Sequence, residues 1–345
     1  MKKFVPLQNG YNLQAKNEDA SVKEQKQVQR YYSQKERFHQ IERSTLIQGF
    51  EINFCLHIHK GLDFHTLLEA SEKSPSKISP EISNFKGDIV INTADIPLYN
   101  KYLESLEKAA FPDKEKGKIN ALVIKEKSKI IMRDVLTDPR SGKNIKNSST
   151  IVEQIAASIF ANKDTLYDLI SIKNFDYYTY THSVNVAVLS IGLGIASSIS
   201  SDKIFSLGFG ALLHDIGKSA ISQEILNKPA KLSLMEFQIM KNHVIEGEKI
   251  LKGHQSLPPD SFDAVTQHHE KLSGNGYPMG IKASAIKPYG RIAAIADCYD
   301  ALTTQRPYKN ALSPFEALNI MLKETENYDQ ELLKTFIKML GKVEQ

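Results

Sequence analysis

The stretch Gly210–Ala220, GALLHDIGKSA, decides the fold of the C-terminal half of the chain. An apolar run from Ile204 to Leu213 predicts a helix that ends at His214-Asp215, with Gly217 as the stop. Adjacent His and Asp side chains at a helix end can point toward a single metal ion, and a carboxylate can bridge two ions. A lone His-Asp pair is common by chance, so the surrounding sequence has to decide whether this one matters.

Further ligand-type residues occupy similar positions in the helical patterns around this stretch. His182 opens the apolar run from Val184 onward, His243 lies in MKNHVIEGEKIL, and His268-His269 ends an apolar run before GNGYP. Asp297 lies in RIAAIADCYDALT. These five histidines and two aspartates all fall between residues 182 and 297. Burying so many ionisable groups is costly unless they pair or bind metal, which indicates a metal site. Asp300 shares a helix face with Asp297 and is expected to orient a ligating histidine.

The composition indicates an ordinary globular protein. The chain has 345 residues, enough for two domains, and is 41% hydrophobic and 24% charged. Two cysteines cannot build a disulfide framework or a cysteine-rich zinc site, so a reducing compartment is expected. No secretory signal is visible at the start, and the longest apolar stretch, Val184 to Ile199, is too short and too polar for a membrane span. These features predict a cytoplasmic protein without a transmembrane segment.

Four regions are expected along the chain. Residues 1–44 are polar and basic, partly disordered or helical; residues 1–50 carry nine Lys/Arg and five Asp/Glu, a net charge of 9 − 5 = +4. Residues 45–112 contain strand-like runs broken by Pro, Gly and Ser, which predicts a small regulatory domain of α/β or β-rich type. Residues 113–149 are expected to be a helical connector, and residues 150–345 an all-α domain. The fold class is therefore mainly α.

His57 and His59 have strand spacing on one face of the small domain. Alternating histidines on a strand could bind a metal, but no carboxylate or cysteine is spaced to complete the site. We expect surface or half-buried residues there.

The segment from Asp176 to Lys309 resembles the HD-GYP family, a branch of the HD-domain metal-dependent phosphohydrolases. The matching motifs, in order, are DYYTYTHS (176–183), HDIGK (214–218), His243, HHEKLSGNGYP (268–278), DCYDALT (297–303) and RPYK (306–309). The resemblance implies an α-helical bundle around a metal centre. It also implies hydrolysis of the bacterial messenger cyclic di-GMP to linear pGpG, and onward to GMP in some members.

The resemblance further implies a role for each matching residue. One metal would be held by His182, His214, Asp215 and Asp297, and a second by Asp215, His243, His268 and His269, with Asp215 bridging. Lys218 matches a lysine that contacts the phosphate and stabilises the transition state. Arg306 and Lys309 match basic residues at the substrate phosphates, and Tyr277 of the GYP loop is expected to line the pocket.

Two departures from the family pattern stand out. After HHE the family commonly has an aromatic residue and then Asp, where this chain has Leu272 and Ser273. Some members carry a Glu four residues before the first His, associated with a third metal, where this chain has Tyr178. Two divalent transition-metal ions are therefore expected. Imidazole and carboxylate ligands bind Fe, Mn, Zn, Ni and Co alike, so the ligand types do not identify the metal. The resemblance favours iron and, after it, manganese. A hydroxide that bridges the two ions is expected to attack the phosphorus atom.

The function expected is a cyclic di-GMP phosphodiesterase. The alternatives are a catalytically weak module that binds a cyclic dinucleotide or a protein, and an HD phosphohydrolase for another nucleotide. No nucleic acid polymer is expected as a partner. A homodimer through the helical connector is expected, with the apolar stripe through Ile151, Ile155 and Ile159 as its dimerisation face. A signalling protein is expected as a second kind of partner.

Overall fold

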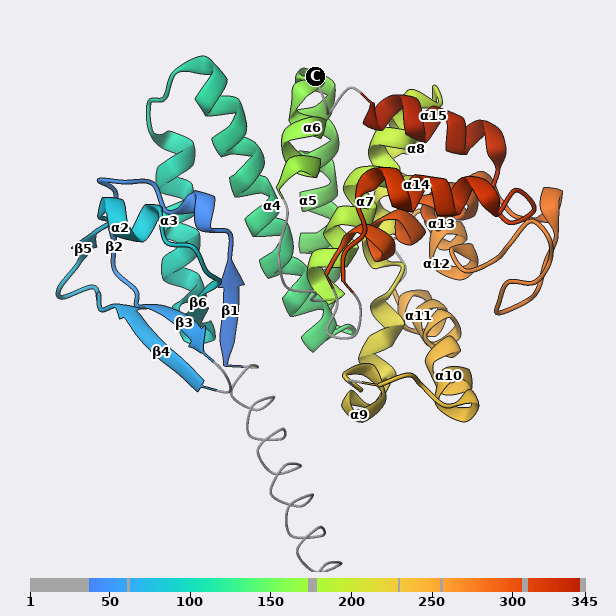
Figure 1. The fold of residues 1–345 in the computed structure, drawn as a ribbon, viewed down its shortest axis with the longest axis horizontal. Helices are drawn as coiled ribbons and strands as arrows, with labels where there is room; N and C mark the ends of the chain where they lie inside the picture. The colour runs from blue at the N-terminus through green and yellow to red at the C-terminus, as the bar shows by residue number, and fades with distance from the viewer. Residues whose placement is uncertain are drawn as a thin grey trace, which may run out of the picture. The chain divides into compact units, whose positions relative to one another are not determined.

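The computed structural model describes residues 37–60, 63–172, 179–228, 230–254, 257–305 and 310–341. The chain divides into two compact units after Ser105 (Figure 1). The first unit contains all the strands among the described residues, and the second is helical. The expected fold class, a helical C-terminal part with a smaller strand-containing N-terminal part, is confirmed.

The first unit is built on an antiparallel sheet with the strand order β1-β6-β3-β4. Its members are β1 (Phe38–Ile41), β3 (Leu56–Lys60), β4 (Asp63–Leu68) and β6 (Ile89–Asn92). The short strands β2 (Glu51–Ile52) and β5 (Ser76–Lys77) pair separately. Short helical turns lie at η1 (Arg43–Thr45), α2 (Pro80–Ser83) and η2 (Thr93–Asp95), and α3 spans Ile96–Lys108.

Strand β1 lies inside residues 1–44, the segment that was expected to be partly disordered or helical. Phe38–Ile41 pairs along its whole length with β6, and His39 and Ile41 are buried there. The partner strand lies about fifty positions later in the sequence, so the four residues alone show little strand character. Residues 1–36 lie outside the described residues.

The second unit is a bundle of helices. In chain order it contains α4 (Asp113–Thr137), α5 (Gly142–Ala161), α6 (Asp164–Ser171), α7 (Thr179–Ala196), α8 (Ser201–Leu213), η3 (Ile216–Ala220), α9 (Gln223–Leu226), α10 (Leu234–Lys241), α11 (His243–Lys252), α12 (Ser261–Gln267), η4 (Ala283–Ala285), α13 (Pro288–Thr303), α14 (Pro314–Lys323) and α15 (Gln330–Leu340).

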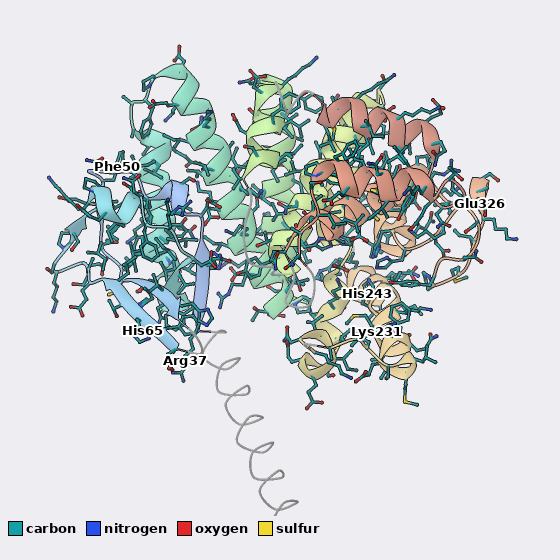
Figure 2. All side chains as sticks on the ribbon, in the orientation of Figure 1. Arg37, Phe50, His65, Lys231, His243 and Glu326 are labelled. Atoms are coloured by element: carbon teal, nitrogen blue, oxygen red, sulfur yellow. The ribbon has the colours of Figure 1, made fainter. Side chains whose placement is uncertain are left out.

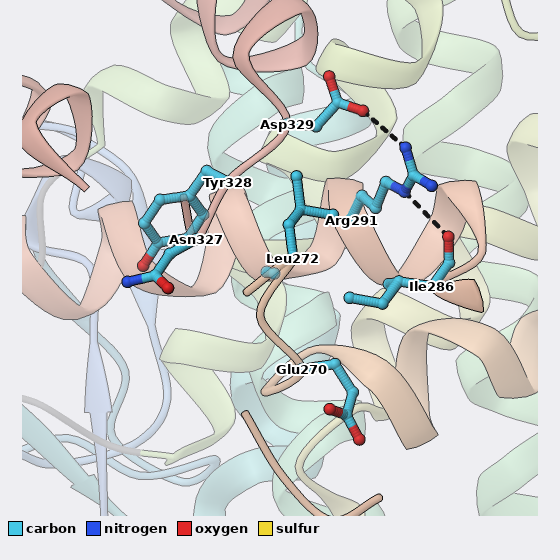
Figure 3. A pocket seen from close by; sticks show the side chains of 8 residues that line it. Glu270, Leu272, Ile286, Arg291, Asn327, Tyr328 and Asp329 are labelled. Carbon is cyan, nitrogen blue, oxygen red and sulfur yellow. Dashed lines mark hydrogen bonds and ion pairs between the residues drawn. The ribbon is translucent and has the colours of Figure 1, made fainter. Parts of the chain in front are cut away.

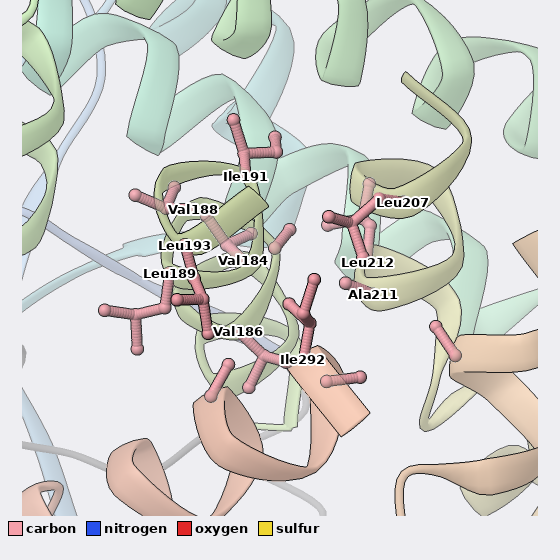
Figure 4. Packing of buried hydrophobic residues seen from close by; sticks show 14 of the residues in the cluster. Val184, Val186, Val188, Leu189, Ile191, Leu193, Leu207, Ala211, Leu212 and Ile292 are labelled. Carbon is pink, nitrogen blue, oxygen red and sulfur yellow. The ribbon is translucent and has the colours of Figure 1, made fainter. Parts of the chain in front are cut away.

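Helix α7 is the centre of this bundle. It packs against α4, α8, α13 and α15, and every residue from Tyr180 to Gly194 except Asn185 is buried. Its apolar residues interlock with Leu207 and Leu212 of α8 and with Ile292 of α13 (Figure 4). A helix that is apolar all round is stable only inside a core, so α7 carries His182 at its start into the middle of the bundle.

The apolar stripe of Ile151, Ile155 and Ile159 is not available for dimerisation. These side chains are 2%, 0% and 2% exposed and belong to the core of their own chain, where α5 packs against α4 and α8. The periodic spacing correctly indicated an apolar face, but the face is covered by neighbouring helices. A homodimer through the connector stays a prediction.

Helix α4, expected as part of a connector, contributes to the same core. Ala121, Met132 and Val135 pack into it with Ile145 of α5. The ammonium of Lys125, 2% exposed, donates to the carbonyl oxygens of Leu169 and Ile172 at 2.9 and 2.6 Å, at the end of α6. Helices on both sides of residue 150 therefore share one core.

Among the described residues, the structure contains no helix that is both long and apolar enough to cross a membrane.

Candidate metal centre

The residues expected as metal ligands sit at helix ends or on inward faces of the second unit. His182 lies in the first turn of α7, His214 and Asp215 follow α8, His243 begins α11, His268 and His269 follow α12, and Asp297 lies on α13. His243 is labelled in Figure 2, above the loops that lead to α10. These positions are far apart in the sequence and come together because α7, α8, α12 and α13 pack against one another.

Gly217 brings the His-Asp turn against α11. A Cβ atom at this position would lie 1.9 Å from the carbonyl oxygen of His243 and 2.4 Å from the amide nitrogen of Gly247, which is sterically forbidden. The glycine was expected as a helix stop. Its larger effect is close packing, which sets Asp215 beside His243.

The potential ligand atoms form two groups that share one residue. Asp215, His243, His268 and His269 form the first, and His182, His214 and Asp215 the second; within each, the ligand atoms lie within 4.8 Å of one another. Asp297 touches both groups, because its Oδ1 lies 3.0 Å from His182 Nε2 and its Oδ2 lies 3.6 Å from His269 Nδ1. All seven expected residues are thus brought together, with Asp215 common to the two groups.

Four of the histidines have their Nδ1 atoms engaged on the side away from this cluster. His214 and His243 donate to the carbonyl oxygens of Ala211 and Met240, both at 2.7 Å, and His268 donates to that of Val265 at 2.9 Å. His182 donates to Asp300 Oδ2 at 2.6 Å. These acceptors determine the tautomer, so each ring carries its proton on Nδ1 and presents the Nε2 lone pair to the centre.

Asp300 lies where the expected orienting role would place it, at the Nδ1 atom of His182. Besides the proton of His182, its carboxylate accepts hydrogen bonds from Asn185 Nδ2 at 2.8 Å and Thr304 Oγ1 at 3.2 Å. With three donors around it, the carboxylate is fixed, and it fixes the imidazole plane in turn.

The Nε2 lone pairs meet other lone pairs, which is the main sign that a cation belongs in the centre. His243 Nε2 and His268 Nε2 face each other at 3.3 Å. In both rings the proton is on Nδ1, which donates it in a hydrogen bond to a backbone carbonyl oxygen, so neither Nε2 atom has a proton to donate to the other. His214 Nε2 and Asp215 Oδ1 are buried without a hydrogen bond in the described part of the chain. A native protein rarely leaves such groups unsatisfied unless an ion completes the site.

The pKa values point the same way. Burial lowers the pKa of His243 and His268, and lowers that of His269 to about 3, so these rings stay neutral near pH 7. Burial alone would raise the pKa of Asp215, but the Lys218 ammonium holds it well below its usual value. The centre therefore combines neutral imidazoles with ionised carboxylates, the donor set of a divalent transition metal. The residues present fit such an ion.

Lys218 borders the cluster directly. Its ammonium lies 2.5 Å from Asp215 Oδ2, and its side chain is 15% exposed. Lys218 was expected at the substrate phosphate; its position beside Asp215 puts a positive charge at the edge of the centre.

The loop after His269 is packed closely onto the histidine pair. The amide of Tyr277 donates to the carbonyl oxygen of His269 at 3.1 Å, and a Cβ atom at Gly276 would lie 2.5 Å from Glu270 Cα. The Tyr277 ring stacks on the His269 ring with centroids 4.5 Å apart. Tyr277 was expected to line the substrate pocket, and its ring lies directly beside the proposed metal ligand His269.

Glu270 holds the loop, a role that the sequence did not reveal. Its carboxylate is 2% exposed and accepts from the amides of Met279, Gly280 and Ile281 at 2.7, 3.1 and 3.1 Å. The signal in the sequence was a glutamate shortly before a glycine-rich turn, whose backbone amides need an acceptor.

Leu272 and Ser273, which depart from the family pattern, are accommodated. The Leu272 amide donates to the carbonyl oxygen of Asn327 at 3.1 Å, and Ser273 Oγ donates to Asn327 Oδ1 at 2.8 Å. Glu270 and Leu272 also line a small pocket that is braced by Arg291, whose guanidinium binds Asp329 and the carbonyl oxygen of Ile286 (Figure 3). None of the seven expected ligands lines that pocket.

Some expectations fall elsewhere. Arg306, Lys309 and Tyr178 lie outside the described residues. His57 and His59 are half-buried, as expected, and the described part of the first unit contains no grouping of potential metal ligands.

Comparison with known proteins identifies the second unit. The profile of the HD domain family matches residues 164–332, which include all seven expected ligands. The match assigns an HD domain to that segment of the second unit. Cyclic di-GMP phosphodiesterase PA4108 of Pseudomonas aeruginosa is 33% identical over 224 residues, 64% of this chain and 54% of the relative. The 3'3'-cGAMP-specific phosphodiesterase 3 of Vibrio cholerae is 40% identical over 148 residues, 42% of this chain and 31% of the relative.

A solved structure shares the fold of this HD-domain chain. Bd1817, a HDG"Y"P protein from Bdellovibrio bacteriovorus, superposes with a TM-score of 0.68 over 88% of this chain and 99% of that one, at 20% identity. The HD-domain part of the expected resemblance is confirmed for residues 164–332. The chain spans about half the length of PA4108, and less of the Vibrio relative.

Proposed function

We propose that this HD-domain protein is a metal-dependent phosphodiesterase that hydrolyses cyclic di-GMP to linear pGpG. The observation that carries the proposal is the pair of Nε2 lone pairs of His243 and His268, 3.3 Å apart in a buried centre of neutral imidazoles and ionised carboxylates. Such a centre needs a divalent cation to be satisfied. The relative from Pseudomonas aeruginosa, named a cyclic di-GMP phosphodiesterase, suggests the substrate.

The proposed ligand sets share Asp215. His182, His214, Asp215 and Asp297 would hold one ion, and Asp215, His243, His268 and His269 the other, with iron as the first candidate and manganese the next. When bound, the ions supply Lewis-acid activation of a water molecule and of the phosphoryl oxygens. The Nδ1 hydrogen bonds of the histidines keep the rings oriented with Nε2 toward the centre.

The remaining proposed roles concern the substrate. Lys218, beside Asp215, would stabilise negative charge that grows on the phosphoryl oxygens. Arg306 would bind a phosphate with two parallel hydrogen bonds, and Lys309 would act as a point charge. A cytoplasmic location, the place where such a messenger acts, belongs to the same proposal.

A second candidate substrate is 3'3'-cGAMP. The relative from Vibrio cholerae has the highest identity of those described above, and its name gives this substrate. Because cyclic di-GMP and 3'3'-cGAMP differ in one base, the metal centre alone cannot separate them.

The test is a direct assay of the full chain. Protein loaded separately with Fe²⁺ or Mn²⁺ is incubated with cyclic di-GMP or 3'3'-cGAMP, and the products are separated by chromatography. Appearance of pGpG from cyclic di-GMP, and its loss on treatment with a chelator, supports the proposal. Faster cleavage of 3'3'-cGAMP would favour the second candidate. Metal-loaded protein that cleaves neither dinucleotide would overturn the proposed function.

A further inference from the structure

Helix α10 places an aromatic ring and a cation beside the loop that covers His269. The Phe237 and Tyr277 rings meet edge to face, with centroids 6.4 Å apart. The Lys241 ammonium lies 4.9 Å from the Phe237 centroid and 5.3 Å from the Tyr277 centroid. Phe237 and Lys241 are four residues apart on one helix, so they share a face. We call these three side chains the α10 platform.

The platform is contiguous with the proposed metal centre. Tyr277 stacks on His269 at 4.5 Å, and its ring centroid lies 6.5 Å from that of His243. A ligand whose phosphate lies at the centre would therefore bring its neighbouring groups next to the platform.

The platform is held in place by the start of α10. Ser233 and Glu236 form a reciprocal capping box, and the Glu236 carboxylate also accepts from Lys228 Nζ at 2.7 Å. These contacts fix the N-terminal turn of α10, the helix that carries Phe237 and Lys241.

The exposure of Phe237 alone would mean little, because single exposed apolar residues are common. Its neighbours Leu234 and Met235 are 89% and 77% exposed, and we base no inference on their exposure alone. Phe237 is 43% exposed and meets a second aromatic ring, a lysine and the edge of the centre at once. That combination of π-faces and a cation is what binds nucleobases.

The two kinds of side chain would contribute differently. A base stacks on an aromatic ring whatever its identity, since every base has a π-face. A lysine ammonium only donates hydrogen bonds, and guanine offers it two acceptors, O6 and N7, whereas adenine has an amino donor in place of O6. Stacking would thus give affinity, and Lys241 would give preference for guanine.

We propose that the α10 platform binds one guanine base of the cyclic dinucleotide, with Phe237 stacking on the base, Tyr277 meeting the base edge-on and Lys241 donating to its O6 and N7. The inference rests on the proposed function, because it takes the phosphate of the same ligand to lie at the metal centre. It adds two residues from α10: Phe237, which gives affinity for a base, and Lys241, which gives the preference for guanine.

The experiment measures binding separately from hydrolysis. Metal-loaded full-length protein is titrated in a calorimeter with hydrolysis-resistant phosphorothioate analogues of cyclic di-GMP and cyclic di-AMP, which differ only in their bases. The variants are Phe237→Ala and Lys241→Met, the latter keeping the length of the stem. Phe160→Ala on α5, 48% exposed, and Lys249→Met on α11 are the matched controls. Metal content and thermal unfolding are compared for all of them.

Phe237→Ala should raise the dissociation constants for both ligands about tenfold, leaving their ratio unchanged. Lys241→Met should reduce the preference for the guanine ligand about tenfold. Both controls should behave as wild type. Unchanged dissociation constants in Phe237→Ala, or an unchanged ratio in Lys241→Met, would overturn the inference. If the wild-type protein binds cyclic di-GMP with these dependences but does not hydrolyse it, the proposed function fails and the base site stands.

Discussion

His182 Nδ1 and Asp300 Oδ2 lie 2.6 Å apart and join α7 to α13 across 118 positions of the sequence. The hydrogen bond turns the opposite nitrogen, Nε2, toward Asp297 Oδ1, 3.0 Å away. A neutral ring with its proton on Nδ1 has only a lone pair on Nε2, so this contact is repulsive unless a cation or a second proton lies between the two atoms. One buried aspartate thus prepares a metal ligand on the other side of the ring.

Replacing Asp300 should weaken metal binding without removing a proposed ligand. In Asp300→Asn the amide cannot match all three donors that surround the carboxylate, and the ring of His182 loses its negatively charged partner. We expect metal affinity to fall by about 10–100-fold, measured by competition with a chelator. Asp168→Asn on α6 is the control and should bind metal normally. Equal affinity in the two variants would argue against an orienting role for Asp300.

Asp215 should matter to both ions at once. Asp215→Ala removes the one residue common to the two groups, so we expect loss of metal from both positions and loss of activity. Metal analysis of the purified variant gives the stoichiometry directly. Full occupancy by two ions in this variant would show that Asp215 does not bridge.

Glu270→Gln should release the loop while leaving every proposed ligand in place. Glutamine has one acceptor oxygen, and its amide nitrogen would face the amide of Ile281, so at least one buried donor loses its partner. We expect a loss of about 1–3 kcal/mol in the free energy of unfolding. Faster hydrogen exchange at residues 276–281 should accompany it, because the amides now bonded to Glu270 are there.

The control for the loop is Glu331→Gln, a surface glutamate paired with Lys334 on α15. Exchange at residues 276–281 should match the wild type in this variant. A Glu270→Gln protein whose loop exchanges as slowly as the wild type would mean that packing around Gly276 and Tyr277 holds the loop without the carboxylate.

The metal-free protein should lose stability as the pH falls below about 6.5. Burial lowers the pKa of His243, His268 and His269 in the folded state, so between pH 6.5 and lower values the unfolded chain binds protons that the folded chain does not. Stability therefore rises with pH in this range, by up to about 1.4 kcal/mol per pH unit for each such histidine. Urea unfolding of chelator-treated protein at pH 7.5 and 5.5 measures the effect, and His268→Gln should reduce it. A stability that stays level or increases toward pH 5.5 would contradict the assignment of neutral rings.

The spacing of the motifs predicted which residues meet, because ligand-type residues at helix ends converge when the helices pack around one core. The spacing of residues in the sequence could not predict which part of a protein covers an apolar helix face. Ile151, Ile155 and Ile159 indicated a helix correctly, yet the covering partner is in the same chain, and periodicity carries no information about that.

Contacts made by the backbone also could not be predicted from the sequence. Gly217 was taken as a helix stop because glycine often ends helices, while its close approach to His243 depends on the packing of η3 against α11. Glu270 was part of the quoted motif without a role, since three amides of a later turn become its donors only in the folded loop. Phe237 and Lys241 showed no pattern of their own, because their partner Tyr277 lies on a different segment.

Because α4 and α5 share one core with the later helices, the structure predicts which truncated fragments can fold. Truncation before residue 150 would remove Ala121, Met132, Val135 and Ile145 from the core and the Lys125 ammonium from the end of α6. We therefore expect residues 150–345 not to fold alone, whereas residues 106–345, the second compact unit, should fold and bind metal. Circular dichroism, thermal unfolding and metal analysis of the two fragments test this. A folded, metal-binding fragment 150–345 would show that α4 is dispensable for the core.

The fragment 106–345 also tests the expected regulatory role of the first unit. The described residues of that unit contain no grouping of metal ligands, so the fragment should retain phosphodiesterase activity if the proposed function holds, at a rate that differs from the full chain. Regulation requires that some ligand or partner bind two states of the first unit unequally, and removing the unit removes that bias. An unchanged rate would leave the first unit without a regulatory effect under the assay conditions. A fragment that folds and holds its metals but has lost all activity, while the full chain is active, would mean that the first unit contributes directly to catalysis.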